Sequence, residues 1–242
     1  MKRLILLAVA TLCLLSSAAA AYVPSPRYGA FELRFGPHRP DSNAIRVTDE
    51  ALSYGDVFGA RESMFRAELE LDWQFARIKE VMSFGVGGLW GFMREEGKAL
   101  YVDDTGAMQE SSDTTALNVM PFGLVGVIRL DVLHEKLSVP LQPYFKGGLA
   151  WYVWWTRTAG ETDNSGGTPG FILMPGLAIQ LDWIDETTAR TFDNEVGVNN
   201  SYIFFEYVYA RVEGFGDSGK MPLSPTSIGA HGTWMVGLCL EF

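Results

Sequence analysis

The strictest constraint on the fold is an alternation of apolar and polar residues between positions 65 and 75. The two sets occupy successive positions: Phe65, Ala67, Leu69, Leu71, Trp73 and Phe75 alternate with Arg66, Glu68, Glu70, Asp72 and Gln74. A period of two places the apolar set on one face of a β-strand and the polar set on the other. A soluble β-sandwich would bury the apolar face, whereas a membrane barrel turns it toward lipid and keeps a polar lumen.

The last strand favours the membrane barrel. An apolar set alternates along it: Trp234, Val236, Leu238, Leu240 and Phe242. Outer-membrane barrels end in such an aromatic strand, which their assembly machinery recognises, whereas the ends of soluble proteins usually fray and are polar. We therefore expect the barrel-assembly machinery to bind this strand through Phe242, and a secreted β-sandwich is the alternative.

The first twenty-one residues have the pattern of a secretory signal peptide. Lys2 and Arg3 precede an apolar run over residues 4–15, and small residues follow. A basic start, a short apolar centre and an Ala-x-Ala end predict export and cleavage after Ala20 or Ala21. We expect residues 1–21 to be removed and residues 22–242 to form the barrel, and cleavage would take the formal charge from −10 to −12.

Composition excludes several classes of protein. Hydrophobic residues make up 48% of the chain and charged residues 20%, so there is enough apolar surface to fold. An acidic chain lacks the cationic surface that a nucleic-acid binder needs. After cleavage Cys239 would be the single cysteine, which excludes an internal disulfide.

The alternation repeats in eight segments. We predict strands over Tyr28–Phe35, Arg61–Arg77, Val81–Met93, Thr115–Val132, Gln142–Arg157, Gly170–Asp182, Ser201–Glu213 and Thr233–Phe242. Long connections follow every odd-numbered strand: residues 36–60, 94–114, 158–169 and 214–232. An even strand number with long outer loops places both termini in the periplasm. The predicted fold is an all-β, eight-stranded antiparallel transmembrane barrel, and ten strands remain open if the first loop contains a hairpin.

One inner connection has a helical pattern. Its apolar residues recur at near-helical spacing: Ile184, Ala189, Phe192 and Val196. Asp182 or Asp185 can cap the start, and Gly197 stands where a helix would end. We predict a short amphipathic helix over Asp185–Val196, under or plugging the periplasmic mouth, with a structured loop as the alternative.

The inward faces of the predicted strands carry a charge network. It contains Glu32, Arg34, Arg66, Glu68, Glu70, Asp72, Arg129, Asp131, Lys146, Asp182, Glu206 and Glu241. Side chains can just fill an eight-stranded barrel, so opposite charges are expected to pair across strands. The acidic surplus leaves a narrow cation-selective path as the alternative. The aromatic residues expected at the lipid interfaces are Trp73, Trp90, Trp151, Trp154, Trp155 and Trp234.

Other candidate chemistry is weaker. His38, His231, Ser224 and Ser227 lie in outer segments, where a lipid-modifying enzyme would hold its histidine and serine, but their spacing matches no catalytic pattern. His134 is placed in an inner turn, far from such a site. We predict no catalytic residue and no cofactor.

The second outer loop is acidic. Glu95, Glu96, Asp103 and Asp104 could share divalent cations with lipopolysaccharide phosphates. A solvated, mutually repelling loop is the preferred interpretation, and no metal site is predicted. The Gly87–Gly88 and Gly147–Gly148 pairs lie within strands and lack the following helix that phosphate binding would require.

Several blocks resemble a family of small, uncharacterised outer-membrane β-barrel proteins of Gram-negative bacteria, with an eight-stranded architecture similar to OmpA and OmpW. They are Glu32–Pro37, Glu68–Asp72, Val139–Leu149, Trp154–Trp155, Leu181–Asp185 and Tyr202–Tyr207. The resemblance implies the fold and the outer-membrane location but no catalytic residues.

Taken together, these patterns predict a monomeric, non-catalytic barrel with a structural or surface-interaction role, in contact with outer-membrane lipid and lipopolysaccharide. A narrow channel or small-ligand transporter is the alternative, and an outer-leaflet lipid enzyme is a weaker one.

Overall fold

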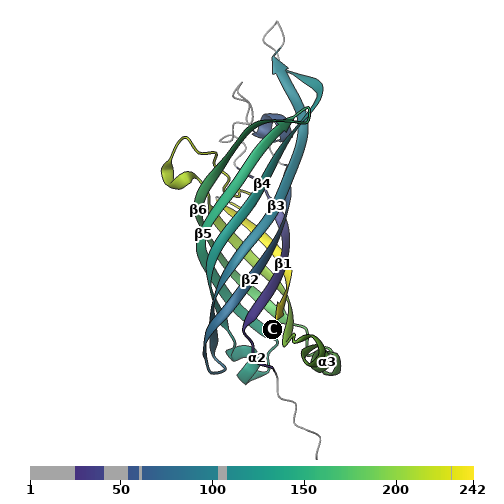
Figure 1. Cartoon of the computed structure of the whole chain (residues 1–242), viewed down its shortest axis with the longest axis vertical. Helices are drawn as coiled ribbons and strands as arrows, with labels where there is room; N and C mark the ends of the chain where they lie inside the picture. Colours follow the sequence, from purple (N-terminus) through teal and green to yellow (C-terminus); the bar gives the residue numbers. More distant parts are fainter. Residues whose placement is uncertain (1–24, 41–53, 60–61, 103–107, 230) are drawn as a thin grey trace, which may run out of the picture.

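Eight antiparallel strands, paired in chain order, close into a barrel (Figure 1). The computed structural model describes residues 25–40, 54–59, 62–102, 108–229 and 231–242, so the predicted signal peptide lies outside the described residues. The strands are β1 (Gly29–His38), β2 (Met64–Ile78), β3 (Met82–Val102), β4 (Met108–Leu130), β5 (Leu141–Thr158), β6 (Glu161–Gln180), β7 (Asn200–Arg211) and β8 (Gly232–Glu241). The predicted eight-stranded antiparallel barrel is confirmed, and the sandwich alternative is wrong.

The barrel closes where β8 pairs with β1. The register places Phe31 opposite Leu240. Beyond the last ladder pair, Phe242 N donates to Gly29 O at 3.0 Å, and Tyr28 N donates to Phe242 O at 2.7 Å. The backbone of Phe242 therefore completes the seam, which leaves β1 and β8 without open edges there.

The two ends of the barrel differ. The end called the base carries α2 (Val132–Leu137), α3 (Glu186–Val196) and the last residues of the chain (Figure 1). The end called the rim carries η1 (Gly55–Gly59), η2 (Gly214–Gly216) and a long β3–β4 hairpin. No helix among the described residues is long and apolar enough to cross a membrane.

The predicted helix is present as α3. Asp185 is its N-cap, because Oδ1 accepts from Thr187 N at 3.0 Å and from Thr188 N at 3.1 Å. Gly197 ends the helix with φ of 78°, a left-handed conformation that glycine adopts without strain. Figure 1 shows α3 beside the base rather than across its mouth. The six-residue α2 was not predicted. It lies in the β4–β5 connection, which is short and was expected to be a turn.

Two predicted outer loops are largely strand. Residues 94–102 and 108–114 form the outer parts of β3 and β4, and the segment 158–169 contains a tight turn and the start of β6. Ala159 and Gly160 make that turn with positive φ. Apolar and polar residues alternate only in the part of a strand that has one face in lipid. The outer extensions are mostly polar on both faces and pair through their backbones, so the residue pattern does not identify them as strand.

The wall is inverted relative to a soluble protein. On β2 the side chains of Leu71 and Trp73 are 61% and 62% exposed, whereas their neighbours Glu70 and Asp72 are buried. Large exposed apolar side chains occur on the other strands as well: Trp90, Leu124, Leu149, Leu177, Phe205 and Leu238. Water is a poor solvent for so extensive an apolar belt, which indicates an apolar surrounding.

Glycines on the inner wall receive aromatic rings from the next strand. Gly176 on β6 lies opposite Tyr144 on β5, and Gly237 on β8 lies opposite Phe204 on β7. A Cβ at Gly176 would meet Tyr144 Cζ at 2.2 Å, and one at Gly237 would meet Phe204 Cζ at 2.4 Å. The absent side chains make the space in which these rings fill the lumen.

Candidate functional site

The centre of the lumen holds a network of ion pairs. Its cations are Arg34, Arg66, Arg129 and Lys146, and its carboxylates are Glu32, Glu68, Glu70, Asp72 and Glu206. All nine side chains are buried. They come from β1, β2, β4, β5 and β7, so the pairs cross the barrel as well as neighbouring strands. An uncompensated charge in such an interior is costly, and each carboxylate here has a cation within reach.

Arg34 joins the two sides of this network. Its Nη1 lies 2.5 Å from Glu206 Oε1, and its Nη2 lies 3.3 Å from Glu32 Oε2 and contacts Glu70. Its Nε lies 3.9 Å from Glu68 Oε2. A guanidinium has five donors in a fixed plane, which allows one side chain to serve several carboxylates.

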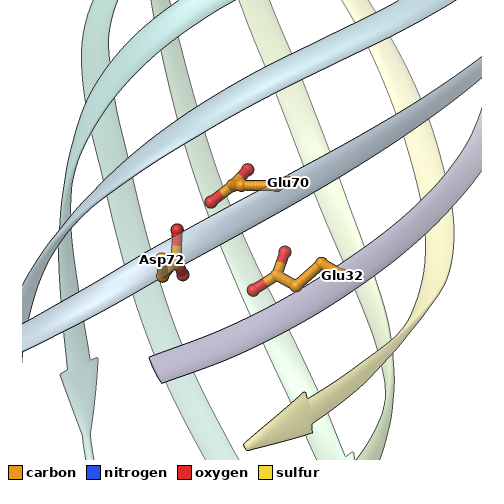
Figure 2. Close-up of side chains that lie close together, drawn as sticks. All are labelled: Glu32, Glu70 and Asp72. Atoms are coloured by element: carbon orange, nitrogen blue, oxygen red, sulfur yellow. The ribbon is translucent and has the colours of Figure 1, made fainter. Parts of the chain in front are cut away.

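Three carboxylates converge inside the barrel (Figure 2). Glu32 and Glu70 are opposite each other in the β1–β2 register, and one oxygen from each of Glu32, Glu70 and Asp72 lies within 4.8 Å of the other two. Such a group could ligate a divalent cation. However, Lys146 Nζ contacts Glu32 and lies 2.9 Å from Glu70 Oε1, while Arg129 contacts Asp72. Side-chain cations already provide the positive charge that a metal would bring.

The remaining predicted members lie toward the base. Asp131 accepts from Gln142 Nε2 at 2.9 Å, and Glu241 accepts from Gln74 Nε2 at 3.1 Å. The prediction that Asp182 faces inward with the network is wrong, because β6 ends at Gln180 and Asp182 lies in the following connection. There its Oδ1 accepts from Ser201 N at 3.2 Å, and partial burial raises its pKa.

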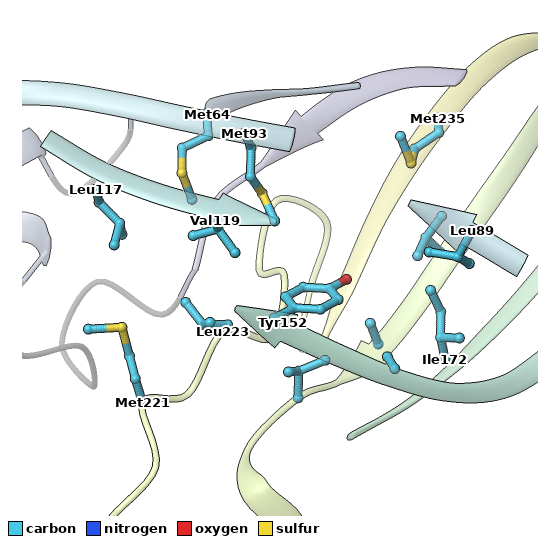
Figure 3. Close-up of a cluster of buried hydrophobic side chains, with 14 of the residues drawn as sticks. Met64, Leu89, Met93, Leu117, Val119, Tyr152, Ile172, Met221, Leu223 and Met235 are labelled. Carbon is cyan, nitrogen blue, oxygen red and sulfur yellow. The ribbon is translucent and has the colours of Figure 1, made fainter. Parts of the chain in front are cut away.

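A large apolar cluster, which the residue pattern does not predict, lies in the lumen toward the rim, next to buried polar side chains such as Arg66 and Thr168 (Figure 3). The cluster includes Met64, Leu89, Met93, Leu117, Val119, Ile172, Met221, Leu223 and Met235. The expected polar lumen is therefore present only in part. Between Ala116 and Ile128 both faces of β4 are mostly apolar, so a period of two gives no sign of which residues point inward.

The β7–β8 connection covers this apolar cluster at the rim. Met221 and Leu223 belong to the buried cluster. Leu223 N donates to Val212 O at 2.8 Å, and Thr168 Oγ1 donates to Met221 O at 2.8 Å. The connection is thus held to β6 and to the end of β7, and its side chains fill the lumen.

The residues considered for a hydrolase do not form a catalytic arrangement. Ser224 Oγ donates to Glu213 Oε1 at 3.3 Å, and His231 Nδ1 lies 3.3 Å from the same oxygen. A serine nucleophile requires a base bonded to its own hydroxyl, whereas here both side chains meet one carboxylate. His38 is buried rather than solvated, with Nδ1 3.4 Å from Arg66 Nη1, and Ser227 Oγ accepts from the backbone of a neighbouring loop.

The acidic outer segment does not gather its carboxylates. Glu95 and Glu96 are consecutive residues of β3, and successive residues of a strand point to opposite faces. Glu96 pairs with Arg94. Asp103 and Asp104 lie outside the described residues, so the divalent-cation hypothesis keeps no assembled site in the part of the chain that the structure describes.

The tryptophans separate into two groups. Four are exposed on the outer wall: Trp73, Trp90, Trp151 and Trp234. Trp155 is half-buried. Trp154 was expected among them, but it packs against the apolar cluster inside the barrel. Tyr152 and Thr156, two positions away on either side, are also buried, so alternation along β5 turns Trp154 inward.

At the base an ion pair ties the start of the described chain to α2. Arg27 Nη2 contacts Glu135, and His134 Nε2 lies 3.4 Å from Glu135 Oε1. The pKa of the Glu135 carboxyl is lowered to about 2, first by its hydrogen bond with His134 and then by Arg27. Above that pKa the carboxylate stays charged, so this tie is present at neutral pH.

Comparison with known proteins gives structural neighbours alone. No family model and no curated protein sequence matches the chain. Among solved structures it is similar to OprG, an outer membrane protein of Pseudomonas aeruginosa, at 12% identity over 89% of this chain and 97% of that one, with a TM-score of 0.48. It is similar to Ail, the attachment invasion locus protein of Yersinia pestis, at 12% identity over 90% of this chain and 100% of that one, with a TM-score of 0.45. It is also similar to Neisserial surface protein A, at 12% identity over 91% of this chain and 99% of that one, with a TM-score of 0.44. The class defined by the strand pairing itself is a closed eight-stranded antiparallel barrel.

Proposed function

We propose that this protein is an exported outer-membrane barrel, monomeric and non-catalytic, with a structural or surface-interaction role. One observation carries the proposal: charged side chains are buried inside the wall while large apolar ones are exposed on it. This inversion suits hydrocarbon outside and ion pairs inside. The shortest strands have ten residues, which is enough for a tilted strand to span a bilayer.

The orientation follows from the connections. The long β3–β4 hairpin and the β7–β8 connection lie at the rim, whereas the base has the tight β2–β3 turn and the two connections that contain α2 and α3. Barrels of this kind expose long loops to the exterior and short turns to the periplasm. The rim is therefore proposed to face the lipopolysaccharide leaflet and the base the periplasm.

The contents of the lumen favour a closed barrel over the channel alternative. Arg34 crosses the middle with its pairs to Glu70 and Glu206, and Met221 and Leu223 fill the rim half. An ion would have to displace both the network and the packed connection. A structural or surface role needs neither to move.

Conductance tests this closure. Purified protein in a planar bilayer should give no discrete current steps, because side chains occupy the path. Folding of the same sample is checked by its altered gel mobility before boiling. Cation-selective steps that Glu70→Ala abolishes would show that the lumen conducts and would favour the channel.

We further propose that β8 is recognised during assembly through Phe242. Phe242→Ala keeps the seam hydrogen bonds, which are made by backbone atoms, and removes an aromatic ring that is 43% exposed. The variant should refold in detergent as the parent does but reach the outer membrane at a several-fold lower level. Phe145→Ala, which removes a similarly exposed ring from the wall, should not lower that level; an equal loss in both variants would count against recognition of Phe242.

A further inference from the structure

A cavity of about 440 Å³ opens at the base, away from the ion-pair network. It lies between the β4–β5 connection, which contains α2, and the β6–β7 connection, which contains α3. Its volume is within the range in which proteins bind small molecules, ~300–1,000 Å³. Its lining includes Arg27, Glu135, Trp183, Glu186, Arg190 and Asn199.

Four charged side chains of this cavity form two ion pairs, and the carboxylate of Asp182, which also lines it, accepts hydrogen bonds from Gln180 and from the backbone of Ser201. Arg27 contacts Glu135, and Arg190 Nη2 lies 3.2 Å from Glu186 Oε2. A charged ligand would have to compete with these pairs. The wall therefore favours a neutral ligand over an anion or a cation.

Neutral amides also line the wall, and their N–H groups donate within the protein: Gln180 to Asp182, Asn199 to Ser25, and Asn200 to Glu241. His134 lines the cavity with them. Among the described atoms, Asn199 Oδ1 and His134 Nδ1 are buried without a hydrogen-bond partner. Such groups are costly unless something else bonds them, which points to a further partner at this place.

One aromatic side chain completes the site. Trp183 lines the cavity and is 61% exposed, so its indole offers a broad apolar face and an N–H donor. A sugar ring matches this combination, because its hydroxyls both donate and accept while its C–H face packs on an aromatic ring.

We propose that this cavity binds a neutral saccharide, with Trp183 as the packing surface and the amides as hydrogen-bonding groups. In one respect the inference rests on the proposed function: if the base faces the periplasm, the glycan strands of the cell wall are the source of the sugar. Free oligosaccharides share the chemistry and are distinguished by the test.

The probe is the disaccharide of N-acetylglucosamine, added to folded protein in micelles of a detergent without a sugar headgroup. The chain has seven tryptophans, and their indole N–H signals can be followed separately by NMR. We expect the signal of Trp183, identified with Trp183→Phe, to shift saturably while the other six stay in place. Trp183→Ala should weaken binding at least tenfold, as judged by backbone signals of α3.

Two further variants show whether binding depends on the cavity itself. Ala189→Trp fills the cavity without removing a polar group and should abolish binding. Trp234→Ala removes an exposed indole from the wall of β8 and should leave affinity unchanged. No shift of Trp183, or tighter binding of a charged dipeptide than of the disaccharide, would overturn the proposal.

The source is tested by sedimentation with purified cell-wall sacculi. Co-sedimentation that Trp183→Ala abolishes assigns the site to the glycan, and a Trp183 shift without co-sedimentation assigns it to free sugars. These readouts are separate from conductance. If the barrel conducts and the Trp183 signal still shifts with the disaccharide, the closed lumen is refuted and the saccharide site is not.

Discussion

Replacing Arg34 with methionine should destabilise the barrel more than any other single loss of charge in the lumen. The change leaves Glu206 without its 2.5 Å cation and removes one of the cations that serve Glu32 and Glu70. Breaking a buried pair by deleting one partner typically costs about 3–5 kcal/mol, because the remaining charge has no water to solvate it. We expect a large drop in the denaturant midpoint for unfolding in micelles, measured by tryptophan fluorescence.

A matched arginine outside the lumen supplies the control. Arg94 pairs with Glu96 on the exposed outer part of β3, where both side chains are about half exposed. Such pairs contribute about 0–1 kcal/mol, so Arg94→Met should hardly move the midpoint. If Arg34→Met behaved like Arg94→Met, the network would be solvated and the closed lumen would be in doubt.

A second comparison separates charge from packing at this position. Arg34→Met combined with Glu206→Gln removes one cation and one carboxylate together. Because the pair is deleted as a unit, this double variant should recover part of the stability lost in Arg34→Met. No recovery would mean that Arg34 acts through its contacts with Met174 and Phe204 rather than through its ion pair with Glu206.

The sequence predicts this site well where one face of a strand differs from the other. Along β2, Arg66, Glu68, Glu70 and Asp72 alternate with apolar residues, and all four are buried in the network. The period of two identifies which residues share the lumen. It does not say which cation meets which carboxylate, because barrel closure brings distant strands such as β1 and β7 together.

The same signal fails where both faces are alike. Leu117 and Val119 belong to the inner apolar cluster, but both faces of β4 are mostly apolar between Ala116 and Ile128. Met221 and Leu223 come from a connection that has no strand pattern, so its packing into the lumen depends on tertiary contacts. For Trp154 the prediction is wrong in the other direction. The cluster of tryptophans suggests that it lies at the lipid interface, but it is on the same face of β5 as the buried Tyr152 and Thr156 and therefore points inward.

Adding a side chain at Gly176 should be the most damaging change of packing. Valine in a strand is ordinarily favourable, on a scale of about 1 kcal/mol. Here the Cβ alone would lie 2.2 Å from Tyr144 Cζ, and the buried ring has little room to move because its hydroxyl donates to Glu206 Oε2 at 3.1 Å. Overpacking of this kind costs roughly 1–3 kcal/mol and occasionally more, so Gly176→Val should lower the unfolding midpoint despite the gain in strand preference.

Gly88 is the matched control, because a Cβ built there meets nothing within 4 Å and the residue faces outward from β3. Gly88→Val should leave the midpoint unchanged or raise it, since an apolar side chain suits the lipid face. In a Tyr144→Ala background the penalty of Gly176→Val should largely disappear, because the ring that it strikes is gone. If Gly176→Val still lowers the unfolding midpoint without Tyr144, the strain lies in the β5–β6 backbone. That result would refute the packing of the Tyr144 ring in the space left by Gly176.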